Sequence, residues 1–334
     1  MSSSKQLQHR RAHNLLLISK LLNCRDNASP FTLIIDSLEQ SGKRLVREFI
    51  RRANAAKTRV IFVSFETLRK PSGVDVFIPF ARQPPTLLQS EIAKATSETA
   101  SRQKTLLVLD TLHPLITHPT TSATLPHLLS SLLSPSTTLL AVYHSDIPLG
   151  PPLASPYQPH PLTLLKYIST TLLTVHALPH ILAEKAARER SVAGPVFGLG
   201  EEVEGAVGGV GRNGGGGVVV EMEHRRKSGR GVREWFFLPT ATGGGGAGAG
   251  KRETAVLLED HPAWRRGEEK EVVAEEEGVD VSFNLGLTEK QRRDREGVVL
   301  PYFDAQRGEG PGEGGRILYD MGVEDDFDEE EDEI

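Results

Sequence analysis

The chain has 334 residues; its apolar share of 38% is low for a compact domain, and its 32 glycines and 21 prolines indicate that part of it lies outside regular structure. The net charge of −5 is unevenly spread, since no acidic residue precedes Asp26 whereas nine of the last eleven residues are acidic. The single cysteine, Cys24, excludes a disulfide framework within one chain and a cysteine-based zinc ribbon, and the sequence contains no run of ~18 apolar residues that would predict a membrane span.

Residues 1–27 are predicted to form an N-terminal helix or extension. Basic residues precede an apolar stretch, as in a signal peptide, but the stretch is short, Lys20 interrupts it, and no small-residue cleavage site follows. We favour an amphipathic helix, and a mitochondrial presequence is the alternative for a segment that contains Arg and Ser and no acid. The residues expected to face the domain are Leu15, Leu16, Ile18, Leu21 and Leu22.

Residues 28–240 alternate between apolar runs and helix-like segments. The runs at 31–36 and 105–110 are apolar along almost their whole length, which is typical of strands buried on both faces. Helical segments between such strands lie over the faces of the sheet. We therefore predict an α/β domain with a mostly parallel sheet flanked by helices. Further strands are expected at 59–66, 74–80, 137–146 and 169–178, and helices at 42–57, 85–100, 124–133 and 161–167.

A β-hairpin is predicted at the end of this domain. Its strands would be Val218–Glu223 and Val232–Leu238, because two β-rich runs flank a short loop that contains glycine. Residues 241–281, which begin with a glycine tract and continue with charged residues, are predicted to be a flexible linker.

Order is expected to return in residues 282–322, interpreted as an interaction segment. Thr288 can cap a helix there, and Gln291 can reach back to complete a capping box. The apolar residues around that helix are too many for a free tail, so they pack on the domain or bind another protein. The acidic residues 323–334 are predicted to be disordered by mutual repulsion. The partner-binding candidates are Phe283, Leu285, Leu300, Tyr302 and Phe303.

The segment SLEQSGKR lies between the first strand and the next helix, where a phosphate-binding loop reads G-x-x-x-x-G-K-[ST]. Gly42 and Lys43 fit this pattern. Ser37 replaces the first glycine, whose backbone freedom lets the loop curl around phosphate, and Arg44 replaces the hydroxyl residue that coordinates Mg²⁺. We therefore predict no cofactor, no metal and no catalysis, and a degenerate but active ATPase or kinase is the alternative.

Two acidic residues bear on the same site. Glu39 places a negative charge inside the presumed phosphate cradle. Asp110 ends an apolar strand, where folds of this kind hold Mg²⁺ through water, but without the hydroxyl partner we prefer a strand-end Asp that caps a turn. The scattered histidines, His113 and His144 among them, show no metal-ligand spacing and are interpreted as ordinary strand-end or loop residues.

Two basic clusters stand out. Lys43, Arg47 and Arg51 share one face of the helix after the loop, which we interpret as a solvated surface. At the hairpin tip, five cations lie within nine residues without an acid, an arrangement that suits contact with nucleic-acid phosphates and equally suits plain exposure to solvent. The candidates for RNA contact are Arg225, Arg226, Lys227, Arg230 and Arg233.

Three segments resemble a known family, subunit five of the Elongator complex: FTLIIDSLEQSGKRLVREFIRRA near the front, and SFNLGLTEKQRRDREGVVLPYFDAQ and GGRILYDMGVEDDFDEEEDEI at the end. The resemblance implies a RecA-like fold without a functional phosphate loop and without catalytic residues. It also implies a hetero-hexameric ring, with two copies each of subunits four, five and six. That ring joins the catalytic part of Elongator, which modifies the wobble uridine U34 of certain tRNAs.

The partners that this resemblance implies are subunits four and six, the catalytic subcomplex and, through the assembly, tRNA. It implies no membrane association and places the protein in the cytoplasm and the nucleus. A third interpretation, from a different class, is a generic interaction protein unrelated to RNA.

Overall fold

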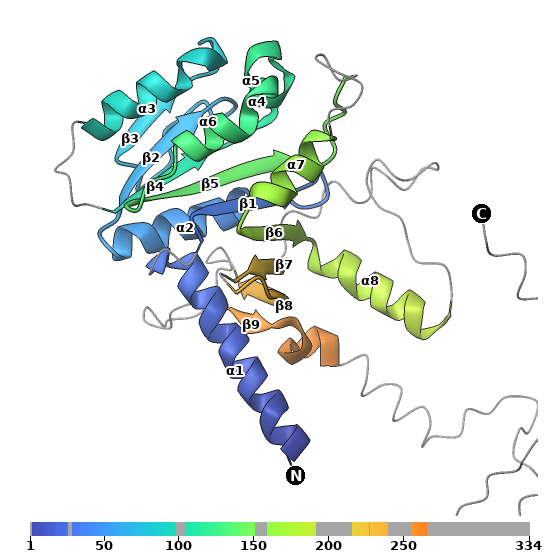
Figure 1. Ribbon diagram of the computed structural model, residues 1–334. Coiled ribbons are helices and arrows are strands. Elements are labelled where there is room, and N and C mark those ends of the chain that lie inside the picture. Colours follow the sequence, from blue (N-terminus) through green and yellow to red (C-terminus); the bar gives the residue numbers. More distant parts are fainter. Residues whose placement is uncertain are drawn as a thin grey trace, which may run out of the picture. The chain divides into compact units, whose positions relative to one another are not determined.

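The apolar runs of the sequence form the centre of one mixed sheet (Figure 1). The computed structural model describes residues 2–25, 29–97, 104–150, 159–191, 216–226, 228–239 and 255–265. The chain divides into two units, Met1–Glu271 and Val272–Ile334, and all described residues belong to the first. The predicted interaction segment at 282–322 and the acidic tail therefore lie outside the described residues, as does Lys227.

The described strands form a nine-stranded sheet in the order β3-β2-β4-β5-β1-β6-β7-β8-β9. Strands β1 to β6 run parallel, and β7, β8 and β9 continue the sheet in antiparallel fashion. The bounds are β1 (Phe31–Asp36), β2 (Arg59–Ser64), β3 (Val76–Pro79), β4 (Thr105–Leu109), β5 (Thr137–His144), β6 (Thr171–His176), β7 (Gly217–Arg225), β8 (Gly231–Pro239) and β9 (Val256–Leu257).

Helices cover both faces of this sheet, as the alternating pattern predicts. Figure 1 shows α3 to α7 on one face and α1 and α2 on the other. The bounds are α1 (Ser2–Leu22), α2 (Lys43–Ala55), α3 (Leu88–Ser97), α4 (His113–Thr117), α5 (Pro119–Ala123), α6 (Leu125–Ser131), α7 (Pro161–Ile168) and α8 (Leu178–Glu189), with short 3₁₀ turns η2 (Pro85–Leu87) and η5 (Leu258–Asp260).

Neighbouring residues of the central strands supply two separate cores. Ile34 of β1 packs with α1 and α2, whereas Leu33 and Ile35 pack with the helices of the opposite face. All six residues of β1 are buried, which is the expected state of a parallel strand covered on both sides. The predicted fold class, a mostly parallel α/β sheet flanked by helices and followed by a hairpin, is confirmed.

The N-terminal helix packs by its second half. Ile18, Leu21 and Leu22 are buried against α2 and the sheet, and Leu15 is partly buried. The expectation for Leu16 is wrong, since its side chain is 67% exposed. Two steps along a helix turn through about 200°, so Leu16 lies on the face opposite to the buried Ile18.

The antiparallel extension contains one element that the sequence did not predict. Residues 256–257, inside the range predicted as a linker, form β9 beside β8, and the side chains of Leu257 and Leu258 are buried. Arg11 of α1 donates to Asp260 at 2.5 Å and so ties this segment to the N-terminal helix. In the described part of the chain, no helix has the length and apolar character needed to cross a membrane.

Candidate functional site

Polar side chains gather where β1, β2, β4 and β5 end side by side. This is the carboxyl edge of the parallel strands, the usual ligand-binding edge of an open α/β sheet. A hollow of about 640 Å³ lies there, and Asp36, Lys43, Glu66, Asp110 and His144 are among the residues that line it. The loop between β1 and α2 therefore stands at the edge where a nucleotide-binding member of this fold class would hold its ligand.

In the loop between β1 and α2, backbone amides donate hydrogen bonds to side-chain acceptors of the same chain. The amide of Gly42 donates to the carboxylate of Asp36 at 2.7 Å, and the amide of Lys43 donates to the hydroxyl of Ser41 at 3.3 Å. The amide of Leu38 donates to the carboxylate of Asp146. A phosphate-binding loop directs such amides at its ligand, whereas here carboxylates and a hydroxyl accept from them.

Gly42 has a steric role of its own. Its φ of −69° is open to any residue, so the position does not need glycine for its backbone conformation. A Cβ there would lie 2.9 Å from Cγ2 of Ile34 and 3.2 Å from Oδ2 of Asp36. Close packing against the end of β1 therefore accounts for this glycine without a phosphate.

A charged chain crosses the edge from β1 to the loop after β2. Nδ1 of His144 lies 2.5 Å from Oδ1 of Asp36, and its Nε2 lies 3.4 Å from Glu66. Nζ of Lys43 lies 3.4 Å from the other oxygen of Glu66. Burial alone would lower the pKa of His144, but its contacts with the carboxylates of Asp36 and Glu66 outweigh burial and raise the pKa to about 9. The side chain of His144 is therefore protonated and positively charged at neutral pH.

His113 stands behind this chain. Its Nε2 lies 3.0 Å from the carbonyl oxygen of His144, and the two rings stack with centroids 5.6 Å apart. Burial lowers the pKa of His113, and the charge of His144 lowers it further. The two histidines thus have opposite protonation preferences. His144 is the last residue of β5, as the strand-end interpretation expects, whereas His113 is the first residue of α4.

Asp110 is surrounded by donors. Its carboxylate accepts from the amides of Phe65, Glu66 and Thr67 at 2.7, 3.0 and 2.8 Å, and from the hydroxyl of Ser64 at 3.3 Å. The residue is 6% exposed. Its role in this structure is to cap the turn after β2, a neighbouring strand, and not the turn that follows its own strand.

Glu39 and Arg44 do not meet across the loop. Oε2 of Glu39 lies 3.1 Å from Nδ1 of His180, so its carboxylate pairs with α8. Arg44 lies in the first turn of α2, and Ser37 donates its amide to the carbonyl of Gln40 at 3.4 Å.

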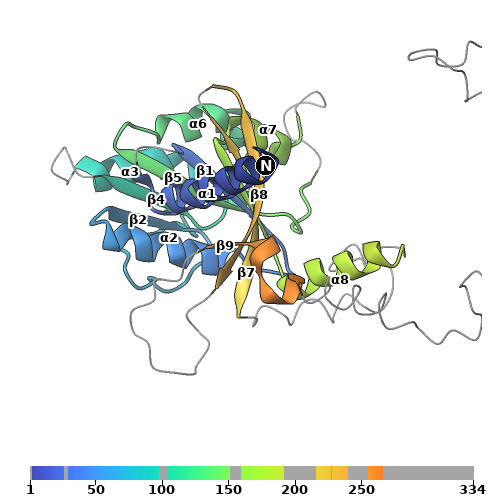
Figure 2. The same ribbon diagram turned by 90° about the horizontal axis from the view of Figure 1, so that it is seen from below.

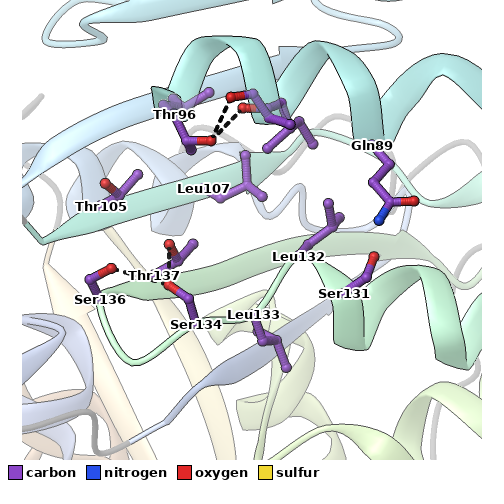
Figure 3. A pocket seen from close by; sticks show the side chains of 13 residues that line it. Gln89, Thr96, Thr105, Leu107, Ser131, Leu132, Leu133, Ser134, Ser136 and Thr137 are labelled. Carbon is purple, nitrogen blue, oxygen red and sulfur yellow. Dashed lines mark hydrogen bonds between the residues drawn. The ribbon is translucent and has the colours of Figure 1, made fainter. Parts of the chain in front are cut away.

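A second hollow lies between α3 and the segment that joins α6 to β5, near the amino ends of β4 and β5 (Figure 3). Its volume is about 280 Å³. Hydroxyl and amide side chains such as Gln89, Thr105 and Ser134 line it together with apolar ones, and none of its lining residues is charged. All the charged chemistry described above therefore belongs to the opposite edge.

The hairpin cations fall into two groups. Arg233 forms an ion pair with Glu221, and Arg225 lies 3.6 Å from Glu223. Arg226 and Arg230 lie at the turn, both are exposed, and neither pairs with an acid among the described residues. The four candidates that the structure describes therefore do not form one equivalent patch.

Sequence reasoning missed the charged chain from Asp36 to Lys43. Asp36 and His144 are 108 positions apart and meet because β5 is the neighbour of β1. One signal was present, since both residues end apolar runs, and the ends of parallel strands share one edge of a sheet.

Two solved structures share low similarity with the chain. They are a DnaB-like replicative helicase and the RadB recombinase, with 9% and 13% sequence identity. The matches cover 62% and 63% of this chain and 56% and 88% of the other chains. Their TM-scores are both 0.37.

Curated relatives are more similar. Elongator complex protein 5 of Schizosaccharomyces pombe is 30% identical over 323 residues, which cover 93% of this chain and 96% of the relative. Elongator complex protein 5 of Saccharomyces cerevisiae is 26% identical over 334 residues, with 96% and 97% covered. A family model described as Elongator subunit Iki1 matches residues 17–320. The chain therefore belongs to the Elongator subunit Iki1 family, that of Elongator complex protein 5.

Proposed function

We propose that this chain is a non-catalytic subunit of the accessory hexameric ring of Elongator, where it assembles with subunits four and six. In that ring it supports tRNA binding and modification of the wobble uridine U34, in the cytoplasm and the nucleus. Membership of the family supports this role, because both curated relatives are named as proteins of the Elongator complex.

The contact between Asp36 and Gly42 carries the non-catalytic part of the proposal. The carboxylate of Asp36 lies 2.7 Å from the amide nitrogen of Gly42. It therefore occupies the place that a phosphate oxygen would take as the acceptor of that amide. A bound phosphate would have to displace this buried carboxylate or lie against it, and two anions in contact repel strongly at low dielectric. The Arg44 guanidinium adds a cation where the hydroxyl ligand of Mg²⁺ is needed.

The alternative, an active ATPase or kinase, has one observation in its favour. Lys43 and Asp110 line the same hollow of about 640 Å³. Titration of the purified chain with Mg-ATP separates the two functions, and we expect no binding at micromolar concentration. Micromolar binding that is lost in Lys43→Ala would refute the non-catalytic role. Lys94→Ala is the matched control, because Lys94 is also an exposed lysine paired with a glutamate.

Contact with tRNA is assigned to the hairpin end. We expect Arg226→Glu combined with Arg230→Glu to weaken tRNA binding by the assembled ring, since both arginines are exposed and have no acid partner among the described residues. Arg82→Glu combined with Lys94→Glu, two exposed cations at or near helix α3, controls for the equal change in net charge. Unchanged tRNA binding in the double variant would favour an interaction protein unrelated to RNA.

Assembly is assigned to the C-terminal segment, whose apolar candidates are named above. We expect deletion of residues 282–306 to reduce co-purification of the other ring subunits more than deletion of residues 324–334. The first segment is rich in apolar residues, and the second is almost purely charged. Equal loss of partners from the two truncated chains would contradict this assignment.

A further inference from the structure

Tyr167 is an exposed aromatic side chain beside the hairpin end. It lies in the last turn of α7, and the residue is 79% exposed. Large aromatic side chains are mostly buried in folded proteins, so a ring that stands open to solvent next to cations is informative. Leu165, two residues earlier in α7, is fully buried and anchors this turn on the core.

The hairpin is tied to the end of α7 by Arg225. Its guanidinium donates through Nη1 to the carbonyl of Tyr167 at 2.8 Å, and its amide donates to the carbonyl of Thr170 at 2.9 Å. On the adjacent residue, the ring of His224 lies 2.8 Å from the hydroxyl of Thr171. These contacts to the backbone of Tyr167 and Thr170 and to the side chain of Thr171 hold the end of α7 against the hairpin.

The turn of the hairpin places two exposed cations next to this junction. The amide of Arg226 donates to the carbonyl of Arg230 at 3.0 Å, and the amide of Gly229 donates to the carbonyl of Arg226 at 2.9 Å. Gly229 has a φ of +80°, a conformation that glycine adopts readily, so the turn is tight. Arg226 and Arg230 consequently face each other across the strand ends, and both are exposed.

Helix α1 extends the basic surface. Nη2 of Arg226 lies 3.5 Å from Nε2 of His13. His9 and Arg10 lie four and three residues earlier on α1, which places them on the same side of the helix, and both are exposed. In Figure 2 the β7–β8 hairpin passes beside α7, and the hydrogen bond from Arg225 to Tyr167 joins the two elements. Among the described residues, the acidic residue nearest to this turn along β7 is Glu223, and it is paired with Arg225.

An exposed aromatic ring beside a turn that carries exposed cations suits the binding of unpaired nucleotides. The cations hold the phosphates, and the ring stacks on a base, which is available in a single strand and hidden in a duplex. We propose that Tyr167 is a base-stacking residue of an RNA site formed with Arg226 and Arg230, and that this site takes unpaired nucleotides rather than a duplex. The inference rests on the proposed role of the assembly in tRNA binding and adds the kind of RNA element that is bound.

The test uses the assembled ring and two probes, a short single-stranded RNA and a duplex of the same sequence. We expect Tyr167→Ala to weaken binding of the single strand about tenfold and to leave duplex binding unchanged. Tyr167→Phe keeps a ring and should bind like the wild type. Tyr167→Leu keeps an apolar side chain without a ring and should behave like Tyr167→Ala.

The salt dependence of RNA binding distinguishes the contribution of the Tyr167 side chain from that of the two arginines. Replacing Arg226 and Arg230 with Gln should reduce the slope of log affinity against log salt by about 1 to 2, because each lost phosphate contact releases one fewer counterion. Tyr167→Ala should leave that slope unchanged, because stacking releases no counterion.

Three results would overturn the inference. If the assembly with Tyr167→Ala binds tRNA and its affinity for single-stranded RNA is unchanged, stacking is refuted and the proposed function stays intact. Loss of the other ring subunits from Tyr167→Ala would show that the ring of Tyr167 is a protein contact. A wild-type assembly that binds neither tRNA nor the single strand would refute the RNA role as a whole.

Discussion

The carboxyl edge of the sheet and the outer end of the β7–β8 hairpin are both rich in charge, and they differ in where that charge is directed. At the edge, Asp36 and Asp110 accept from donors of the same chain, and His144 joins Asp36 to Glu66. At the hairpin end, Arg226 and Arg230 face solvent. Charge that is satisfied internally stabilises the fold, whereas exposed charge of one sign is available to a partner.

The largest expected effect is at Asp110, where the comparison is sharpest. Asp110→Ala would leave the amides of Phe65, Glu66 and Thr67 without their acceptor, so we expect the free energy of unfolding to fall by about 3 to 5 kcal/mol. Urea unfolding of the isolated chain measures this loss. Asp110→Asn keeps one oxygen acceptor and should lose less. Unaltered stability in both variants would mean that the carboxylate does not cap the turn after β2.

The charged chain at His144 predicts a dependence of stability on pH. The pKa of His144 is raised from 6.5 to about 9 in the folded protein, so its stabilising contribution is complete below pH 6.5 and is lost as the pH rises through 9. The shift corresponds to about 3 kcal/mol at most. Asp36, Glu66, Lys43 and His113 are the charged or titratable groups that face it.

Urea unfolding at several values between pH 6.5 and 9.5 measures this contribution. In His144→Gln the decline with pH should flatten, whereas His127→Gln, on helix α6, should follow the wild type. An equally steep decline in His144→Gln would assign the pH dependence to other groups.

A smaller effect is expected at Gly42. In Gly42→Ala the new methyl group would meet Ile34 at 2.9 Å, so we expect the unfolding free energy to fall by about 1 to 2 kcal/mol. Gly231→Ala is the matched control, because a Cβ there has no atom within 4 Å. If Gly42→Ala were as stable as the control, packing against β1 would not explain this glycine.

The smallest effect on stability is expected at the hairpin end. Replacing Arg226 and Arg230 with Gln should change the unfolding free energy by less than about 0.5 kcal/mol, since both side chains are exposed. The same double variant is expected to lower tRNA affinity. A marked loss of stability would remove the contrast between the two regions and place these arginines among the residues that maintain the fold.

Most of the parallel sheet could be predicted from the sequence because fully apolar runs have few alternatives. The run at 31–36 matches β1 at both ends. The strand β9 could not be predicted, because two residues within a charged segment offer no periodicity. Leu16 was wrongly expected to face the domain, because a leucine-rich stretch does not by itself show which side of the helix packs against the core.

The site could be predicted in position but not in its contacts. Gly42 and Lys43 mark the loop after the first strand, and this depends on local order alone. The pairing of Asp36 with His144 depends on strand order, which local patterns do not specify. The sorting of the hairpin cations depends on which arginines lie beside Glu221 and Glu223, and this follows from side-chain direction along β7 and β8.

The two edges of the sheet limit how the chain can associate. In the described residues, one edge is β3, a strand of four residues that ends in Pro79, and the other is β9, a strand of two residues. Short strands and proline both discourage the addition of a foreign strand. Continuous β-pairing between copies or with a neighbouring subunit is therefore disfavoured at these edges, which favours association through helices, loops and side chains.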